Sequence, residues 1–103
     1  MALTAPNLSG STAFITGTTR GIGKQLALAL ADCGCNVVST GKTTDDDETE
    51  LEGTVEQTAR EARDRGVEAL ALELALRDAD RVEAAGETSL ARFGEVDIVI
   101  HNA

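Results

Sequence analysis

The stretch Thr16-Gly17-Thr18-Thr19-Arg20-Gly21-Ile22-Gly23 joins an apolar, strand-like run at residues 12–15 to a helix-like run that continues to Cys33. A glycine-rich turn between a strand and a helix is the context in which such a motif indicates dinucleotide binding. One glycine permits the tight turn, one lets the backbone approach the pyrophosphate, and one lets the helix pack close to the sheet. The free N–H groups at the helix start and the helix dipole then attract the phosphate charge.

Two other nucleotide-binding motifs do not fit this stretch. The spacing G-x-G-x-x-G is absent, because glycines at 17, 21 and 23 give G-x-x-x-G-x-G. A P-loop requires G-x-x-x-x-G-K-[ST]. Gly23 and Lys24 supply the last G-K, but Thr18 stands where the first glycine is needed and Gln25 where the hydroxyl is needed.

The rest of the chain alternates strand-like and helix-like segments. We predict strands at about 12–16, 36–40, 69–74 and 96–101, and helices at about 21–33, 54–65 and 78–93. This alternation implies βαβ units and a parallel sheet with helices on both faces. Right-handed crossovers give the strand order 3-2-1-4, with ligand expected at the carboxyl ends of strands one and four. At 103 residues, the chain is one domain at most.

Helical spacing also predicts which face of each helix is buried. The inward residues are Ile22, Leu26, Ala29, Leu30 and Cys33 in the first helix, Val55, Thr58, Ala59 and Ala62 in the second, and Val82, Ala85, Gly86, Ser89, Leu90 and Phe93 in the third. Only two residues are aromatic, so the core is expected to be aliphatic. Gly86 costs about 1 kcal/mol relative to alanine unless close packing requires it.

The T-G-x-x-x-G-x-G form resembles the short-chain dehydrogenase/reductase family. Residues 96–103, Val-Asp-Ile-Val-Ile-His-Asn-Ala, resemble that family's fourth strand and the start of its N-N-A-G motif. Within the family, residues 41–44 and 51–55 look most like the hydroxysteroid-dehydrogenase-like branch. The resemblance covers essentially the whole chain. It implies a Rossmann-type dinucleotide-binding half-domain over residues 1–103, truncated after strand four.

The cofactor predicted for this half-domain is NADP(H). An NAD-type site places a carboxylate near the end of strand two, but Gly41 stands there and Lys42 follows. Lys42 and Arg20 would attract a 2′-phosphate, and in the family such a basic pair marks NADP(H) users. The alternative is that both are ordinary surface cations. The predicted cofactor-binding residues are Thr16, Gly17, Thr19, Arg20, Gly21, Ile22, Gly23, Lys42, Asn102 and Ala103.

Two positions depart from the family pattern. Ala75 stands where the family has an aspartate after strand three that holds the adenine. The lost contact is worth about 1 kcal/mol. His101 replaces the first asparagine of N-N-A-G, a mild change because histidine also donates a hydrogen bond.

The family's catalytic residues are not found in this chain. In relatives, a serine and a Tyr-x-x-x-Lys pair lie in the second half, whereas this chain has no tyrosine and only two lysines, Lys24 and Lys42. A hydride transfer of the family's type needs a phenol to exchange the proton on the carbonyl side. We expect the cofactor-binding part of an oxidoreductase acting on an alcohol or carbonyl, inactive by itself. The alternative is a non-enzymatic nucleotide-binding or protein-interaction module that pairs through strand four.

The net charge of −9 comes from 18 acidic and 9 basic residues. It suits either an ordinary acidic cytoplasmic protein or one adapted to high salt. Nucleic acid is not expected as a partner, because phosphate binding requires a basic surface. The chain has neither an apolar run of the roughly 20 residues that span a bilayer nor a signal peptide at its start, so we expect the cytoplasm.

No metal site is predicted. Cys33 and Cys35 offer only two ligands, with His101 distant in sequence, and are expected to pack as apolar side chains. The acidic block at residues 45–50 could attract a divalent cation, but it lacks EF-hand spacing and is better interpreted as a solvated loop. The edge of strand four, residues 96–101, is expected to promote self-association.

Overall fold

The computed structural model describes residues 7–18, 21–41, 54–74 and 79–102. Its elements, in chain order, are β1 (Thr12–Ile15), α1 (Gly21–Asp32), β2 (Asn36–Gly41), α2 (Val55–Arg63), β3 (Ala69–Glu73), α3 (Ala79–Phe93) and β4 (Ile98–Ile100). All strand pairs are parallel, and the strand order is β3-β2-β1-β4. The predicted Rossmann-type sheet is therefore confirmed.

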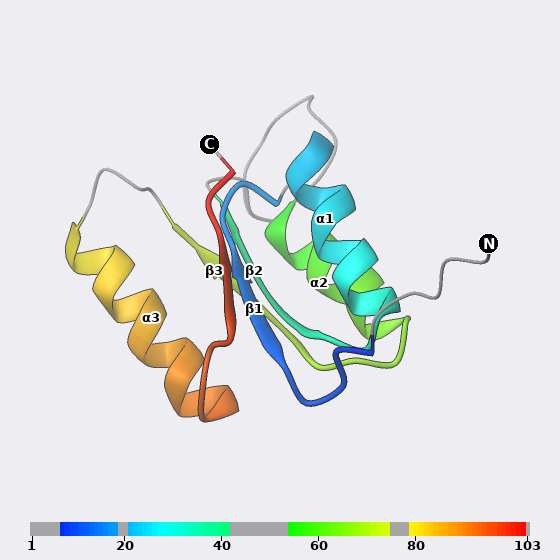
Figure 1. Cartoon of the computed structure of the whole chain (residues 1–103). Helices are drawn as coiled ribbons and strands as arrows, with labels where there is room; N and C mark the ends of the chain where they lie inside the picture. Colours follow the sequence, from blue (N-terminus) through cyan, green and yellow to red (C-terminus); the bar gives the residue numbers. More distant parts are fainter. Residues whose placement is uncertain (1–6, 19–20, 42–53, 75–78, 103) are drawn as a thin grey trace.

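The helices form a layer on each face of this sheet. Figure 1 shows α1 and α2 on one side and α3 on the other. The chain runs from β1 to β2 to β3 in one direction and then returns past β1 to β4. Each crossover is right-handed, so a crossover that runs in the opposite direction across the sheet places its helix on the opposite face. The crossover from β3 to β4 runs in that opposite direction and contains α3. None of the described helices is long and apolar enough to cross a membrane.

The hydrophobic core lies between the sheet and the helices α1 and α2. Most of its side chains are small, and all are aliphatic or cysteine, as the composition suggested. The buried members are Ala13, Ile15, Ala27, Ala31, Cys35, Val37, Ala59, Ala62 and Ala69. The predicted inward face of α2 is confirmed, because Val55, Thr58, Ala59 and Ala62 are all fully buried.

The predicted inward face of α1 is wrong for three of its residues. The three wrongly predicted residues, which are exposed, are Ile22, Leu26 and Ala29. The residues of α1 that are buried instead are Gly23, Ala27 and Ala31. Both sets recur at helical spacing, since α1 is apolar around most of its circumference. Close approach to the sheet selects the stripe with the smallest side chains, which periodicity alone does not distinguish.

The predicted inward face of α3 is correct only along its centre. Ala85 and Ser89 are buried, whereas Val82 is 37% exposed and Leu90 is 50% exposed. Among the described helices, α3 alone lies on this face of the sheet (Figure 1). Because Ala85 and Ser89 are one helical turn apart, their burial shows that only a narrow stripe of α3 is covered. A Cβ added at Gly86 would meet nothing within 4 Å. Close packing therefore does not explain the glycine in α3.

Candidate functional site

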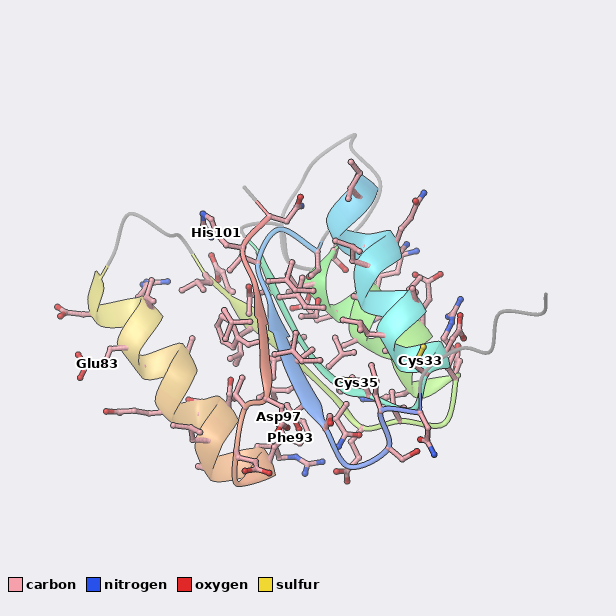
Figure 2. The ribbon with its side chains drawn as sticks, in the orientation of Figure 1. Cys33, Cys35, Glu83, Phe93, Asp97 and His101 are labelled. Carbon is pink, nitrogen blue, oxygen red and sulfur yellow. The ribbon has the colours of Figure 1, made fainter. Side chains whose placement is uncertain are left out.

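The glycine turn lies where the strand order changes direction. It follows β1, whose neighbours are β2 on one side and β4 on the other. Figure 2 shows His101, just after β4, at the edge of the sheet where α1 begins, and Asp97 at the opposite end. In open parallel sheets, ligands bind outside the carboxyl ends of the strands at such a switch point. The sheet thus brings the turn and the end of β4 together where the sequence predicts a ligand.

The three glycines of the turn have different structural roles. Gly17 and Gly21 have φ angles of +68° and +66°, in the left-handed region that favours glycine. A Cβ on Gly17 would also collide with the Asn102 carbonyl oxygen. A Cβ on Gly23 would collide with the Gly17 carbonyl oxygen and lie 2.6 Å from Asn102 Nδ2. Gly17 and Gly21 therefore bend the chain, and Gly23 lets α1 begin directly against the turn.

Asn102 supports the turn from the β4 side. Its backbone N–H donates to Thr16 Oγ1 at 2.9 Å, and its side-chain Nδ2 donates to the Gly17 carbonyl at 3.2 Å. The Thr16 N–H donates to the Ile100 carbonyl at 3.0 Å, which extends the pairing of β1 with β4. His101 Nδ1 lies 3.3 Å from Thr16 Oγ1, so the histidine that departs from the family pattern keeps a polar contact with the turn.

Thr18 supports the turn from the opposite side. Its N–H donates to the Thr40 carbonyl at 3.1 Å, and its carbonyl accepts the Thr58 hydroxyl at 2.6 Å. Its own Oγ1 lies 2.6 Å from Ser39 Oγ. Thr18, Ser39, Thr40 and Thr58 all have an exposed fraction of 0%. The glycine turn is thus bonded to β2 and α2 as well as to β4.

Sequence reasoning did not select Thr18, Ser39 or Thr58 as site residues. A signal was present for two of them: Ser39 lies in the predicted strand at 36–40, next to Val37 and Val38, and Thr58 lies on the predicted inward face of α2. Buried hydroxyls almost always have a hydrogen-bond partner, so these two pointed to a polar contact inside the fold.

The remaining predicted site residues fall into two groups. Thr19, Arg20, Lys42 and Ala103 lie outside the described residues, as do Ala75 and the acidic block at 45–50. Ile22 is 70% exposed at the start of α1. Lys24, which is not one of the predicted site residues, has its Nζ 2.7 Å from Glu61 Oε2 and so joins α1 to α2.

The cysteines lie away from the glycine turn, at the end of α1 (Figure 2). Cys35 is fully buried and Cys33 is partly buried. Burial raises the pKa of the Cys35 thiol, and the negative charge of Asp97 raises it further, against a smaller lowering by a hydrogen bond with the backbone of Ala13. In the described parts of the chain, no three His, Cys, Asp or Glu side chains gather as metal ligands.

Comparisons with known proteins agree with this geometry. The family model for short chain dehydrogenases matches residues 11–103. The rat hydroxysteroid dehydrogenase-like protein 2 is 42% identical over 96 residues, which cover 93% of this chain and 18% of that protein. The chain spans 18% to 23% of the length of such curated relatives. The resemblance to the hydroxysteroid-dehydrogenase-like branch is confirmed.

Two solved structures show the same fold. A short chain dehydrogenase from Mycobacterium thermoresistibile is 38% identical with a TM-score of 0.86, and the match covers 93% of this chain and 34% of that one. A short chain dehydrogenase from Mycobacterium paratuberculosis, bound to NAD, is 25% identical with a TM-score of 0.80. That match covers 94% of this chain and 38% of the other.

Proposed function

This chain belongs to the short-chain dehydrogenase family, and on that premise we propose that it is the NADP(H)-binding part of an oxidoreductase acting on an alcohol or carbonyl substrate. The observation that carries the proposal is the glycine turn. Two left-handed glycines and the closely packed Gly23 hold it at the carboxyl edge of the sheet, where strand order reverses. A turn of this form accommodates a pyrophosphate. The relative from Mycobacterium paratuberculosis has NAD bound.

The residues at the end of β2 favour NADP(H) over NAD(H). Thr40 accepts a hydrogen bond from the Thr18 N–H, so this end of β2 lies against the glycine turn. An NAD-type site uses a carboxylate near this point to bond the ribose 2′-hydroxyl. Gly41 provides none, and Lys42 follows it in the chain. Lys42, together with Arg20, supplies the positive charge that a 2′-phosphate requires.

Calorimetric titration of the chain with NADP+ and with NAD+ tests this preference. We expect NADP+ to bind about tenfold to a hundredfold more tightly, the value of one charge-assisted contact. Lys42→Asp should lower or reverse the ratio. Arg92→Asp is the matched control, because Arg92 is at the far end of α3 and pairs with Glu68 at 3.2 Å. Equal affinities, or tighter binding of NAD+, would contradict the assignment.

We propose that the chain by itself turns over no carbonyl substrate. It has no tyrosine, so no phenol can exchange the proton of the reacting carbonyl. The measurement is NADPH oxidation by the purified chain with and without an added carbonyl compound. Steady oxidation that depends on the carbonyl compound and exceeds the level of contaminants would contradict the proposal.

A second candidate function is that of an interaction module, favoured by the position of β4. Among the described strands, β4 pairs only with β1, and Val99 on it is 70% exposed. An exposed apolar edge strand can pair with another chain, here a second copy. Sedimentation velocity across a wide concentration range should show dimers that Val99→Lys dissociates. Ile22→Lys, at an equally exposed site on α1, is the control. A monomer throughout would contradict this candidate.

We also propose that the acidic composition is an adaptation to salt. With a net charge of −9, repulsion among carboxylates destabilises the folded chain at low ionic strength, and salt screens it. The melting temperature should therefore rise as KCl is added. A flat or falling melting temperature would remove the proposal and leave an ordinary acidic protein.

A further inference from the structure

Three residues with buried hydroxyls, Thr58, Thr18 and Ser39, are linked by hydrogen bonds in a chain that begins and ends on α2. Thr58 Oγ1 donates to the Thr18 carbonyl at 2.6 Å. Ser39 Oγ donates to the Val55 carbonyl at 2.9 Å. Thr18 Oγ1 lies 2.6 Å from Ser39 Oγ, in a hydrogen bond that either hydroxyl can donate, and 3.2 Å from the Thr40 carbonyl. We call this chain, made by Thr58, Thr18 and Ser39, the hydroxyl relay.

The relay ties the glycine turn to the first turns of α2. Both terminal groups, the Val55 carbonyl and the Thr58 hydroxyl, belong to that end of the helix. The helix start is itself fixed, because the Gln57 N–H donates to the side chain of the capping residue Thr54 at 3.0 Å. The relay therefore connects the turn to a capped, buried helix end rather than to a loose segment.

The relay and two neighbouring contacts together fix the orientation of the peptide groups on either side of Thr18. A trans peptide is planar, so the direction of its C=O determines the direction of its N–H. The peptide before Thr18 is held at both ends. Its carbonyl, that of Gly17, accepts a hydrogen bond from Asn102 Nδ2, and its N–H, that of Thr18, donates to the Thr40 carbonyl. The peptide after Thr18 has its carbonyl held by Thr58. Consecutive peptides are thus aimed by contacts from opposite sides of the turn.

Overall stability alone does not require hydroxyls here. A buried hydrogen bond has a small net effect on stability, and an apolar pair of similar shape can be nearly neutral. What the hydroxyls add is direction, since valine would fill the volume of Thr58 without holding the Thr18 carbonyl. We propose that the hydroxyl relay is a positioning device that holds the glycine turn in the conformation that receives the phosphates of the dinucleotide. The identity of the ligand rests on the proposed function, whereas the effect of the relay on the conformation of the turn does not.

The test compares Thr58→Val, which removes the donor at nearly constant volume, with Thr58→Ser, which keeps it. Hydrogen exchange of the Thr18 amide should accelerate in Thr58→Val and stay at the wild-type rate in Thr58→Ser. Affinity for NADP+ should fall about tenfold in Thr58→Val and change less than about twofold in Thr58→Ser. Ser89→Ala is the control for loss of a buried hydroxyl, because Ser89 donates within α3 to the Ala85 carbonyl at 2.8 Å. It should alter neither readout.

The outcomes separate the relay from the proposed function. If the wild-type chain binds neither NADP+ nor NAD+, the proposed function fails, and the exchange of the Thr18 amide still decides whether the relay holds the turn. If Thr58→Val folds with unchanged exchange and unchanged affinity, the inference is wrong. If Thr58→Val does not fold, Ser39→Ala replaces it, because this variant leaves the Val55 carbonyl without its hydroxyl donor. Exchange of the Thr18 amide should then accelerate and affinity for NADP+ should fall, as expected for Thr58→Val.

Discussion

The two faces of the sheet differ in how closely their helices pack against it. On the face of α1 and α2, small side chains such as Ala27 and Ala59 are fully buried, and ion pairs Lys24–Glu61 and Arg65–Asp32 join the helices at 2.7 and 2.9 Å. On the other face, α3 keeps Leu90 half-exposed.

The tightly packed face is the one that adjoins the glycine turn. Gly23 begins α1 in contact with the turn, and Thr58 of α2 holds the Thr18 carbonyl. A site that must place backbone N–H groups within a few tenths of an ångström needs a rigid support. The difference between the faces therefore indicates that precise contact is concentrated where the ligand is expected.

The largest expected effect compares two branched aliphatic side chains on adjacent strands. Ile15 is fully buried against α1 and α2, whereas Val99 is 70% exposed. Ile15→Ala should lower the free energy of unfolding by about 2–5 kcal/mol, through lost burial and a residual cavity. Val99→Ala should change it by less than about 0.5 kcal/mol. Urea denaturation measures both. Similar losses would mean that the two faces are equally packed.

A glycine substitution in α1 should have the next largest effect. Gly23→Ala should lower the free energy of unfolding by about 3 kcal/mol, because the added Cβ overlaps the Gly17 carbonyl oxygen and a packed site relaxes poorly. Dinucleotide affinity should fall with it, since the turn must shift. A chain that tolerates Gly23→Ala with wild-type stability and affinity would show that α1 does not need this close approach.

The same substitution in α3 should have the opposite sign. Gly86 is helical, has no positive φ, and has open space where a Cβ would lie. Gly86→Ala should raise the free energy of unfolding by about 1 kcal/mol, because alanine has the higher helix propensity and restricts the unfolded chain. Thermal and urea denaturation of this variant beside Gly23→Ala provide the measurement. Destabilisation by Gly86→Ala would reveal a contact on the α3 face that the fold does not show.

The fold could be predicted well from the sequence because the residues that end each helix and strand are recognised from their neighbours in the chain. Glycines at 34, 66 and 94 follow the three helices, and a short strand comes after each of these glycines. Thr16, Gly17 and Gly23, predicted from the glycine motif, and Asn102, predicted from the resemblance at residues 96–103, lie together in the structure. Such patterns depend on neighbours in the chain, so they can be recognised without a structure.

What the sequence could not predict depends on tertiary contact. Thr18 meets Ser39 across 21 positions and Thr58 across 40, and nothing near Thr18 in the chain marks it as a buried anchor. The buried stripe of α1 was missed for a related reason. Ile22 and Gly23 both fit helical spacing, and only the closeness of the turn determines which of them faces inward.

The remaining expected effect is a dependence of stability on pH in the densely packed face. Burial, with the charge of Asp97, raises the pKa of the Cys35 thiol, so the folded chain keeps its proton at pH values where the unfolded chain loses it. Above the ordinary thiol pKa of about 8.5, the unfolded state then binds fewer protons, and the free energy of unfolding falls as pH rises. The slope from one group is at most about 1.4 kcal/mol per pH unit.

Few other groups obscure this alkaline window, because the chain has no tyrosine and only two lysines. Urea denaturation between pH 8 and 10 should show the decline in the wild-type chain, and Cys35→Ala should flatten it. Cys33→Ala, which changes the partly buried cysteine two positions away, removes only the smallest of the causes that raise the Cys35 pKa, so as the matched control it should leave most of the decline in place. If Cys35→Ala keeps the full decline, the thiol of Cys35 is hydrated in the folded chain, and the α1–α2 face is less tightly closed at this end than at the glycine turn.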